Sequence, residues 1–266
     1  MRQGTGTDKL LLDIEDGIAR ITFNNPGKHN ALSIEMREGL VSALKTVRDD
    51  KEVRVVVLTG AGDKAFVSGA DISEFKEQRT SAESRAVFDR AGEQLARAWA
   101  DLNMPVIAMI RGYCIGGGLL TAMQADIRIA SDDAQFGVPA ARLGLGYGYG
   151  GVKQLVDTVG SAWTAEILFS ARRLSADEAL HIGLVNRVVA SDQLETEGMG
   201  LADMIRANAP LTIAACKAAI REARRDPDRR NLEAVAAMVE ACFRSDDYIE
   251  GQRAFLEKRP PRFEGR

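Results

Sequence analysis

Two glycine-containing segments have residue types that can bind a partial negative charge through the main chain. Residues 65–75 read AFVSGADISEF, and residues 112–118 read GYCIGGG. Small residues let a ligand approach the backbone, and the first amides of a helix have no partner within that helix, so they can point at an oxyanion. The same glycines would also suit plain tight turns, and spacing alone leaves both interpretations open.

The elements that position these segments alternate between strand and helix. Apolar runs predict strands at residues 53–58, 105–110 and 126–130, and helical spacing predicts helices near 81–101 and 119–124. The β-branched run at 53–58 indicates a strand that is buried on both faces. Such alternation is typical of parallel strands joined by crossover helices. Because ligands bind at the carboxyl ends of such strands, we expect the two glycine segments to meet there.

Local signals define the remaining elements. Asp16-Gly17, between two β-prone runs, predicts a hairpin, and Ser33 is a predicted helix N-cap. Ser175 and Glu178 have the spacing of a capping box. After a short predicted strand at 184–189, the chain has no further strand candidate. Helices are predicted at residues 201–208, 211–224, 232–243 and 248–258.

The composition excludes several classes of protein. The 266 residues are 45% hydrophobic and 27% charged, with a net charge of −3, which is typical of a globular domain. Balanced charge argues against nucleic acid or an anionic membrane as the main partner. No apolar run approaches the roughly 20 residues that span a bilayer, and residues 1–9 lack the apolar core of a signal peptide. We expect a cytoplasmic protein with no nucleic-acid or membrane partner.

Metal chemistry is also disfavoured. Cys114, Cys216 and Cys242 make an odd count with no CxxC spacing, which argues against a disulfide framework or a structural zinc site. His29 and His181 are far apart in the chain and leave few nitrogen ligands. We therefore expect no metal and no separate cofactor.

Several segments taken together resemble the crotonase, or enoyl-CoA hydratase/isomerase, superfamily along nearly the whole chain. They are residues 25–32 (NPGKHNAL), 65–75, 105–118 (PVIAMIRGYCIGGG), 135–139 (QFGVP), 174–189 and 255–263 (FLEKRPPRF). The resemblance implies an α/β fold, with a ββα spiral core at residues 1–194 and an all-helical C-terminal oligomerisation region at 195–266. It also implies acyl-CoA thioester substrates, coenzyme A as part of the substrate, and a homotrimer or hexamer.

The resemblance further implies that the thioester carbonyl binds between the backbone N–H groups of Ala70 and Gly117. Charge develops on that oxygen as an enolate, and one such donor contributes about 3–4 kcal/mol to the transition state. Without the resemblance, Lys28 and His29 would be interpreted as a surface charge and a packed loop residue. The residues implied to contact the CoA ester are Lys28, His29, Ala31, Ser68, Asp71, Ile72, Ile115, Pro139 and Ala140, with Lys258 and Phe263 completing a neighbouring subunit's site.

The sequence departs from the hydratases of that family at two positions. Hydratases carry two glutamates that activate water and supply a proton, and the matching positions here hold Leu120 and Ala140. Each acid or base contributes about 10²–10⁴-fold to the rate, so we expect ordinary hydration of enoyl-CoA to be weak or absent. The position of the acid in dehalogenase- and dienoyl-isomerase-like members holds Gly148.

Residues 143–151, LGLGYGYGG, resemble the tyrosine-bearing loop of methylmalonyl-CoA-decarboxylase-like crotonases, with a one-residue insertion. Decarboxylation suits such a site, because departing carbon dioxide leaves its electrons behind and no base is needed. Tyr147 is the catalytic candidate, although Tyr147 and Tyr149 could instead only pack the glycine loop. Arg142 is a candidate partner for a substrate carboxylate or simply an exposed arginine.

Two other classes of protein are alternatives to an acyl-CoA lyase or isomerase. Residues 146–151 contain GxGxxG, but the preceding predicted strand ends far upstream, near Ala130, and no predicted strand follows at the right distance, which argues against a dinucleotide-binding oxidoreductase. A non-catalytic CoA-ester-binding protein is favoured by the missing glutamates and opposed by the intact glycine segments.

Overall fold

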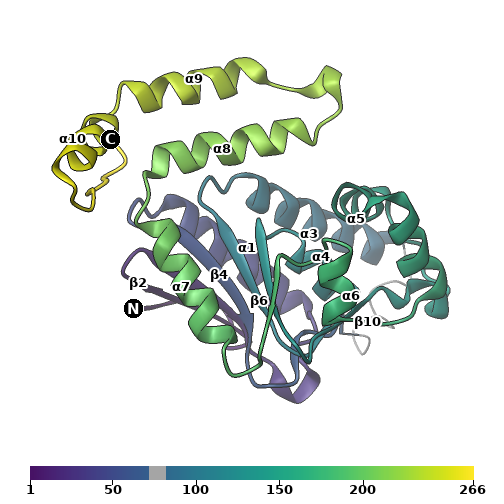
Figure 1. Cartoon of the computed structure of the whole chain (residues 1–266). Helices are drawn as coiled ribbons and strands as arrows, with labels where there is room; N and C mark the ends of the chain where they lie inside the picture. The colour runs from purple at the N-terminus through teal and green to yellow at the C-terminus, as the bar shows by residue number, and fades with distance from the viewer. Residues whose placement is uncertain (72–81) are drawn as a thin grey trace.

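The computed structural model describes residues 1–71 and 82–266, and it contains two β-sheets (Figure 1). The strands of the large sheet are, in spatial order, β1 (Arg2–Gln3), β2 (Leu10–Glu15), β3 (Ile18–Phe23), β4 (Val55–Gly60), β6 (Val106–Ile110), β8 (Ile127–Ser131) and β11 (Arg187–Val189). The strands of the small sheet are β10 (Leu174–Ser175), β9 (Gln135–Gly137), β7 (Tyr113–Ile115) and β5 (Ala65–Val67). Neighbouring strands from β3 to β11 run parallel, whereas β1, β2 and β3 pair antiparallel.

Successive strands alternate between the two sheets. β4, β6 and β8 lie side by side in the large sheet, and the strand after each one, β5, β7 or β9, lies in the small sheet. Each pair leads toward a helix: α3 (Ala82–Ala100), α4 (Gly117–Ala122) and, after the short η2 (Pro139–Leu143), α5 (Tyr149–Ser170). The chain is therefore a spiral of ββα units, and the predicted α/β fold class is confirmed.

Most of the local sequence signals are confirmed. Asp16 and Gly17 both have positive φ in the turn between β2 and β3, as a tight hairpin requires. The hydroxyl of Ser33 accepts a hydrogen bond from the Met36 amide and caps α1 (Ile34–Asp49). The capping box of Ser175 opens α6 (Ala176–His181). Each of these features depends only on residues that are close in sequence.

Several elements were not predicted. The strands of the small sheet have two or three residues each, too short for a two-residue alternation to be visible. Helix α5 begins in the glycine-rich segment and bends at Gly160, where φ is +77°. Helix α7 (Leu194–Arg206) begins earlier than residue 201, because Leu194 already packs against the large sheet.

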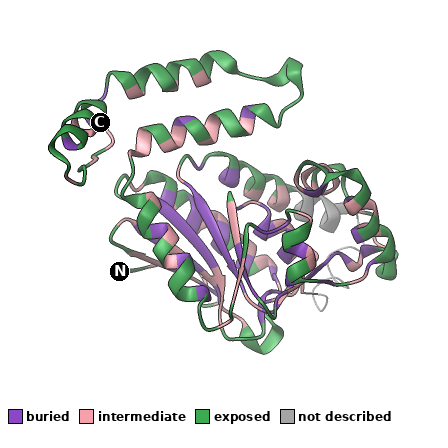
Figure 2. Cartoon of the chain, viewed as in Figure 1, coloured by how far each residue is buried: buried purple, intermediate pink, exposed green. Residues whose placement is uncertain are grey.

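The large sheet is buried on both faces. Val56 and Leu58 of β4 belong to the main core with α1, whereas Val55 and Val57 pack on the other face, under α7. The burial predicted for residues 53–58 is confirmed except at Arg54, which is half-buried. Figure 2 shows that the buried residues are concentrated in the strands and in the helix faces turned toward them. Within residues 1–71 and 82–266, no helix combines the length and the apolar character that crossing a membrane requires.

The C-terminal helices α8 (Pro210–Ala223), α9 (Leu232–Phe243) and α10 (Asp246–Glu257), with the short η3 (Pro227–Arg229), extend away from the sheets and are mostly exposed (Figures 1 and 2). We call residues 210–266 the arm. The Lys217 ammonium donates to the Met104 carbonyl at 2.8 Å and pairs with Asp126 at 2.7 Å, which fixes α8 on the core. The predicted all-helical character of this part is confirmed; its division from the core at residue 194 and its role in oligomerisation remain predictions.

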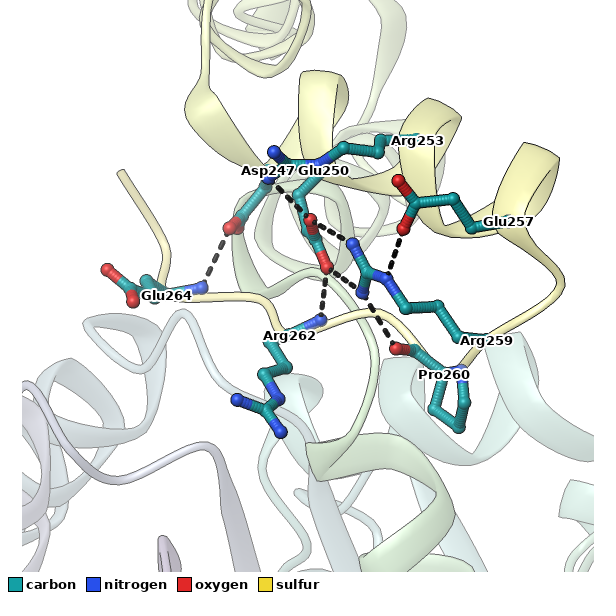
Figure 3. Close-up of polar contacts among 8 residues, drawn as sticks. All are labelled: Asp247, Glu250, Arg253, Glu257, Arg259, Pro260, Arg262 and Glu264. Carbon is teal, nitrogen blue, oxygen red and sulfur yellow. Dashed lines mark hydrogen bonds and ion pairs between the residues drawn. The ribbon is translucent and has the colours of Figure 1, made fainter.

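Two carboxylates fold the end of the chain back onto α10 (Figure 3). Asp247 accepts the backbone amides of residues 264 and 265 at 2.7 and 2.9 Å. Glu250 accepts the Arg262 amide at 3.0 Å and pairs with the Arg259 guanidinium at 2.6 Å. Hydrogen bonds from Arg259, then from the Arg262 amide, hold the pKa of Glu250 far below its ordinary range. Polar contacts of two carboxylates therefore hold the tail against α10.

We predict that Glu250→Gln loosens the tail. Loss of the carboxylate removes the strong acceptor of the Arg262 amide, so that amide should exchange with deuterium faster than in the parent protein. Because the folded pKa of Glu250 lies below its ordinary value of 4.5, its contribution is complete above that pH and is lost as pH falls below it. Glu257→Gln is the matched control, since Glu257 contacts only Arg259 in this cluster. Unchanged protection of the Arg262 amide in the Glu250 variant would contradict this account.

Candidate active site

The two glycine segments lie side by side, as predicted. Residues 69 and 70 follow β5, residues 116 and 117 follow β7, and these two strands pair in parallel. A Cβ atom placed on Gly117 would lie 3.8 Å from the Ala70 nitrogen. The strands that present the segments are the short β5 and β7 of the small sheet, whereas the sequence pattern had pointed to the longer strands β4 and β6 before them.

Each glycine of the triplet has a different physical role. Gly116 has a φ of +55°, a conformation that few other residues adopt, and it turns the chain from β7 into α4. A Cβ on Gly118 would overlap the Val67 carbonyl oxygen, so only glycine lets α4 begin against the end of β5. Gly117 meets only ordinary contacts, and its missing side chain leaves the space in front of Ala70 open.

The amides of Ala70 and Gly117 are both available as donors. The Leu32 amide donates to the Gly69 carbonyl at 2.7 Å, and the Asp71 amide donates to the Leu32 carbonyl at 3.0 Å. These two hydrogen bonds lie on either side of residue 70 and do not use the Ala70 amide. Neither the Ala70 nor the Gly117 N–H has an acceptor among the residues that the structure describes. Two adjacent unpaired donors can bind one oxygen that carries partial negative charge.

Asn30 fixes the loop that supports this pair, and sequence analysis missed it. Its buried side-chain nitrogen donates to the carbonyls of Ala61 and Ala65 at 3.0 and 2.8 Å, and its oxygen accepts the Asn25 amide at 2.9 Å. The loop is thereby tied to the connection between β4 and β5 that leads to Ala70. Asn30 has a φ of +55°, a conformation that asparagine tolerates better than most residues. The asparagine in this loop was therefore the sequence feature that could have predicted its role.

Five of the predicted ligand-binding residues lie together beside the donors. The Lys28 ammonium pairs with the Asp71 carboxylate at 2.8 Å; the Asp71 side chain is 9% exposed and that of Lys28 is 55% exposed. The Ser68 amide donates to the His29 carbonyl at 3.1 Å, and the Ala31 amide to the Lys28 carbonyl at 3.0 Å. These contacts join the predicted loop residues to the segment that follows β5.

A cavity of about 220 Å³ adjoins this group, and Ser68, Ile115 and Pro139, which the resemblance implies contact the CoA ester, line it. Tyr113 and Arg173 also line it, and sequence analysis missed both. The Arg173 guanidinium carbon lies 4.9 Å from the centre of the Tyr113 ring. Because Tyr113 and Arg173 are distant in sequence, only the pairing of β7, β9 and β10 brings them together.

Tyr147 lies next to Leu120, on the acyl side that the resemblance implies. A Cβ on Gly151 would be 2.9 Å from Tyr147 Cε1 and 3.3 Å from Leu120 Cδ2, so the ring and the leucine share that space. The Tyr147 hydroxyl is buried and has no hydrogen-bond partner within the described residues. Burial raises its pKa, so the phenol stays protonated at neutral pH. Tyr149, in contrast, is 77% exposed at the start of α5, so it does not pack the loop.

The remaining candidates are placed differently. Ala140 is buried in η2. Lys258 ends α10 with a φ of +55°, and Phe263 packs near Gly251, so both lie on the arm and away from the donors of the same chain (Figure 1). Ile72 is outside the described residues. Among residues 1–71 and 82–266, no three His, Cys, Asp or Glu side chains cluster as a metal site would require; the expected absence of a metal remains a prediction.

A spiral of ββα units with paired amides after two adjacent strands defines a crotonase-type α/β protein. The family model described as enoyl-CoA hydratase/isomerase matches residues 13–266, and the chain belongs to this family. It is therefore an enzyme of the hydratase/isomerase type, with its exact reaction left open. The resemblance noted in the sequence is confirmed at the level of the family.

Curated relatives and solved structures agree with this assignment. A short-chain-enoyl-CoA hydratase of Clostridium acetobutylicum is 38% identical over 252 residues, which cover 95% of this chain and 96% of that protein. A crotonyl-CoA hydratase of Syntrophomonas wolfei is 36% identical, with 96% and 98% covered. The crystal structure of an enoyl-CoA hydratase/carnithine racemase from Magnetospirillum magneticum is 37% identical with a TM-score of 0.92, covering 100% of this chain and 97% of that one.

Proposed function

We propose that this enzyme transforms acyl-CoA thioesters by stabilising a thioester enolate between the amides of Ala70 and Gly117, and that ordinary hydration of enoyl-CoA is weak. The observation that carries the proposal is the pair of adjacent N–H groups without acceptors among the described residues. The names of the relatives, which are CoA-ester hydratases, support a thioester substrate.

The main chain supplies the electrophilic part of the chemistry. When a bond at the carbon next to the thioester carbonyl breaks, its electron pair moves onto the carbonyl oxygen. Ala70 and Gly117 then donate to an oxygen that carries more charge than in the bound ester, and each donor stabilises the transition state by about 3–4 kcal/mol. Since both donors are backbone groups, this step needs no particular side chain.

The proton-transfer part lacks the groups that a hydratase uses. Leu120 and Ala140 occupy the positions that, by resemblance, hold the two glutamates, and neither can deprotonate water. Leu120 faces the protonated phenol of Tyr147, whose raised pKa makes it a donor rather than a base. The site therefore favours a reaction that needs stabilisation of an enolate but no strong base.

Decarboxylation of a malonyl-type CoA ester is the second, more specific candidate. The C–C bond to the carboxylate breaks, carbon dioxide leaves, and the remaining electron pair forms the enolate that later takes up a proton at carbon. The observation in its favour is the buried Tyr147 hydroxyl, which has no partner in the described residues and can donate to a substrate carboxylate or carry the proton. Such a buried donor costs free energy when it stays unpaired.

We expect this enzyme to release carbon dioxide from methylmalonyl-CoA or malonyl-CoA faster than it hydrates crotonyl-CoA. Both rates would be measured on the same preparation, by carbon dioxide release and by the absorbance of the enoyl thioester. Tyr147→Phe should lower the decarboxylation kcat by about 10–100-fold, the usual size of a lost proton donor, without lowering Tm, since the hydroxyl has no hydrogen-bond partner in the described part of the fold.

Tyr149→Phe is the matched control and should leave both rates unchanged, because Tyr149 is exposed. Fast hydration of crotonyl-CoA by the parent enzyme would overturn the proposal that hydration is weak. Binding of every ester, seen as a rise in Tm, without turnover of any would instead favour the non-catalytic CoA-ester-binding protein.

Restoring the two carboxylates tests the placement of the acyl site. We predict that Leu120→Glu with Ala140→Glu raises crotonyl-CoA hydration by at least about 10²-fold, because each group supplies acid–base catalysis. Leu120→Gln with Ala140→Gln has the same size without the ionisable group and should give no gain. A folded glutamate variant that binds CoA esters and gains no hydration would show that these positions do not face the reacting carbons.

We also propose that the arm covers a neighbouring subunit in a homotrimer or hexamer and brings Lys258 and Phe263 to that subunit's site. Its support is the exposure of Phe243, Phe255 and Leu256 on α9 and α10, beside a groove of about 740 Å³. Apolar area of this kind is typical of a protein interface. Light scattering should give the mass of three or six chains, and a monomer at micromolar concentration would contradict the proposal.

A further inference from the structure

Two arginines of the 220 Å³ cavity have no acidic partner among residues 1–71 and 82–266. Arg142 and Arg173 line it together with Arg172, whose guanidinium is paired with Glu166 and Glu178 at 2.6 and 2.8 Å. Within the described residues, neither Arg142 nor Arg173 contacts a carboxylate. In the part of the chain that the structure describes, the cavity therefore holds two positive charges without a carboxylate partner, and such charges favour an anionic ligand.

Arg173 is held in place before any ligand arrives. Its guanidinium lies over the Tyr113 ring at 4.9 Å and donates to the Gln135 side-chain oxygen at 3.2 Å. These partners are neutral, so they orient the group without cancelling its charge. Arg142 is exposed in η2, on the segment between Pro139 and the glycine-rich loop. One guanidinium held in place, and one with no partner in residues 1–71 and 82–266, suit a ligand that approaches from solvent.

The cavity is continuous with the residues expected to bind CoA. Ser68 lines it, and the Ser68 amide donates to the His29 carbonyl. The His29 ring meets the Tyr113 ring edge to face at 6.0 Å, and Tyr113 lines the cavity too. Lys28, expected near the CoA phosphates, already pairs with Asp71. Arg142 and Arg173 are therefore the cations on this path that lack a carboxylate among the described residues.

We propose that Arg142 and Arg173 form a subsite that binds a phosphate group of the CoA ester. The inference rests on the proposed function and adds residues that recognise the non-reacting part of the substrate. Guanidinium groups bind phosphate through paired, charge-assisted hydrogen bonds. A carboxylate of the acyl group is the less favoured ligand, because Leu120 and Tyr147, on the acyl side, do not line this cavity.

Arg142→Gln should weaken the binding of acetyl-CoA by about threefold to tenfold, the range expected for one partly exposed ion pair. Titration calorimetry would give the Kd, and the difference from the parent should shrink at high salt. Arg142 makes no hydrogen bond with the described residues, so Tm should not change. Lys51→Gln, in the turn before β4, removes an equal charge at the opposite end of the strands and should leave the Kd unchanged.

The choice of ester identifies the group that is bound. Acetyl-pantetheine, which has no phosphate, should bind the variant and the parent equally, whereas acetyl-dephospho-CoA separates the 3′-phosphate from the diphosphate. Arg173→Lys keeps the charge but loses the paired hydrogen bonds, and its affinity for acetyl-CoA should also fall.

Several outcomes would overturn the subsite. Arg142→Gln could bind acetyl-CoA as tightly as the parent, or it could lose affinity for acetyl-pantetheine equally. A loss seen only with malonyl-CoA would assign Arg142 to the acyl carboxylate instead. In each of these cases the parent still binds CoA esters, so the proposed function survives; a parent that binds none of them would overturn both proposals.

Discussion

The structure depends on the close approach of three stretches of backbone to strand β5. A Cβ on Gly60 would overlap the Ala65 carbonyl oxygen, one on Gly112 the Lys64 carbonyl oxygen, and one on Gly118 the Val67 carbonyl oxygen. Each glycine lies where a strand of the large sheet passes to the small sheet or where β7 passes into α4. Side chains at these positions would push the units apart, so the spiral closes around β5 only with glycine there. The adjacent amides of Ala70 and Gly117 are a direct consequence of that closure.

An anion site made of main chain leaves the side chains around it free to differ. Leu120 and Ala140 can stand where, by resemblance, hydratases hold glutamates without moving the donors, because Gly118 and Asn30 hold the two segments through the backbone and through a buried amide. A chain that shares 38% of its residues with a short-chain-enoyl-CoA hydratase can therefore keep the fold and the paired amides while its acid–base groups change. Family membership defines the architecture, and the side chains define the reaction.

Sequence patterns predicted the parts of this molecule that depend on neighbouring residues. The Asp16-Gly17 hairpin, the Ser33 cap and the doubly buried strand β4 follow from local chemistry or from an unbroken apolar run. The small sheet could not be predicted in this way, because its strands are too short to show a period. The contact of Arg173 with Tyr113 was equally invisible, since it exists only after β7, β9 and β10 have paired. The donor roles of Ala70 and Gly117 were predicted from the resemblance to a family rather than from hydrophobic periodicity.

In the proposed site, the charged groups that would bind the substrate and the neutral groups that would act on its carbonyl lie in different places. Neutral groups lie around the proposed reacting carbonyl: two amides, Leu120 and a phenol whose pKa is raised by burial. The charges of Lys28 and Asp71 beside them are paired with each other. Arg142 and Arg173, which line the cavity together with Ser68, carry positive charge that has no carboxylate partner in the described part of the chain. Ion pairing at a remote phosphate strengthens substrate and transition state equally, and so lowers KM without changing kcat. Neutral donors at the carbonyl act mainly when charge moves onto the oxygen, and in a site shielded from water that difference is large. The proposed enzyme thus uses charge for affinity and backbone dipoles for rate.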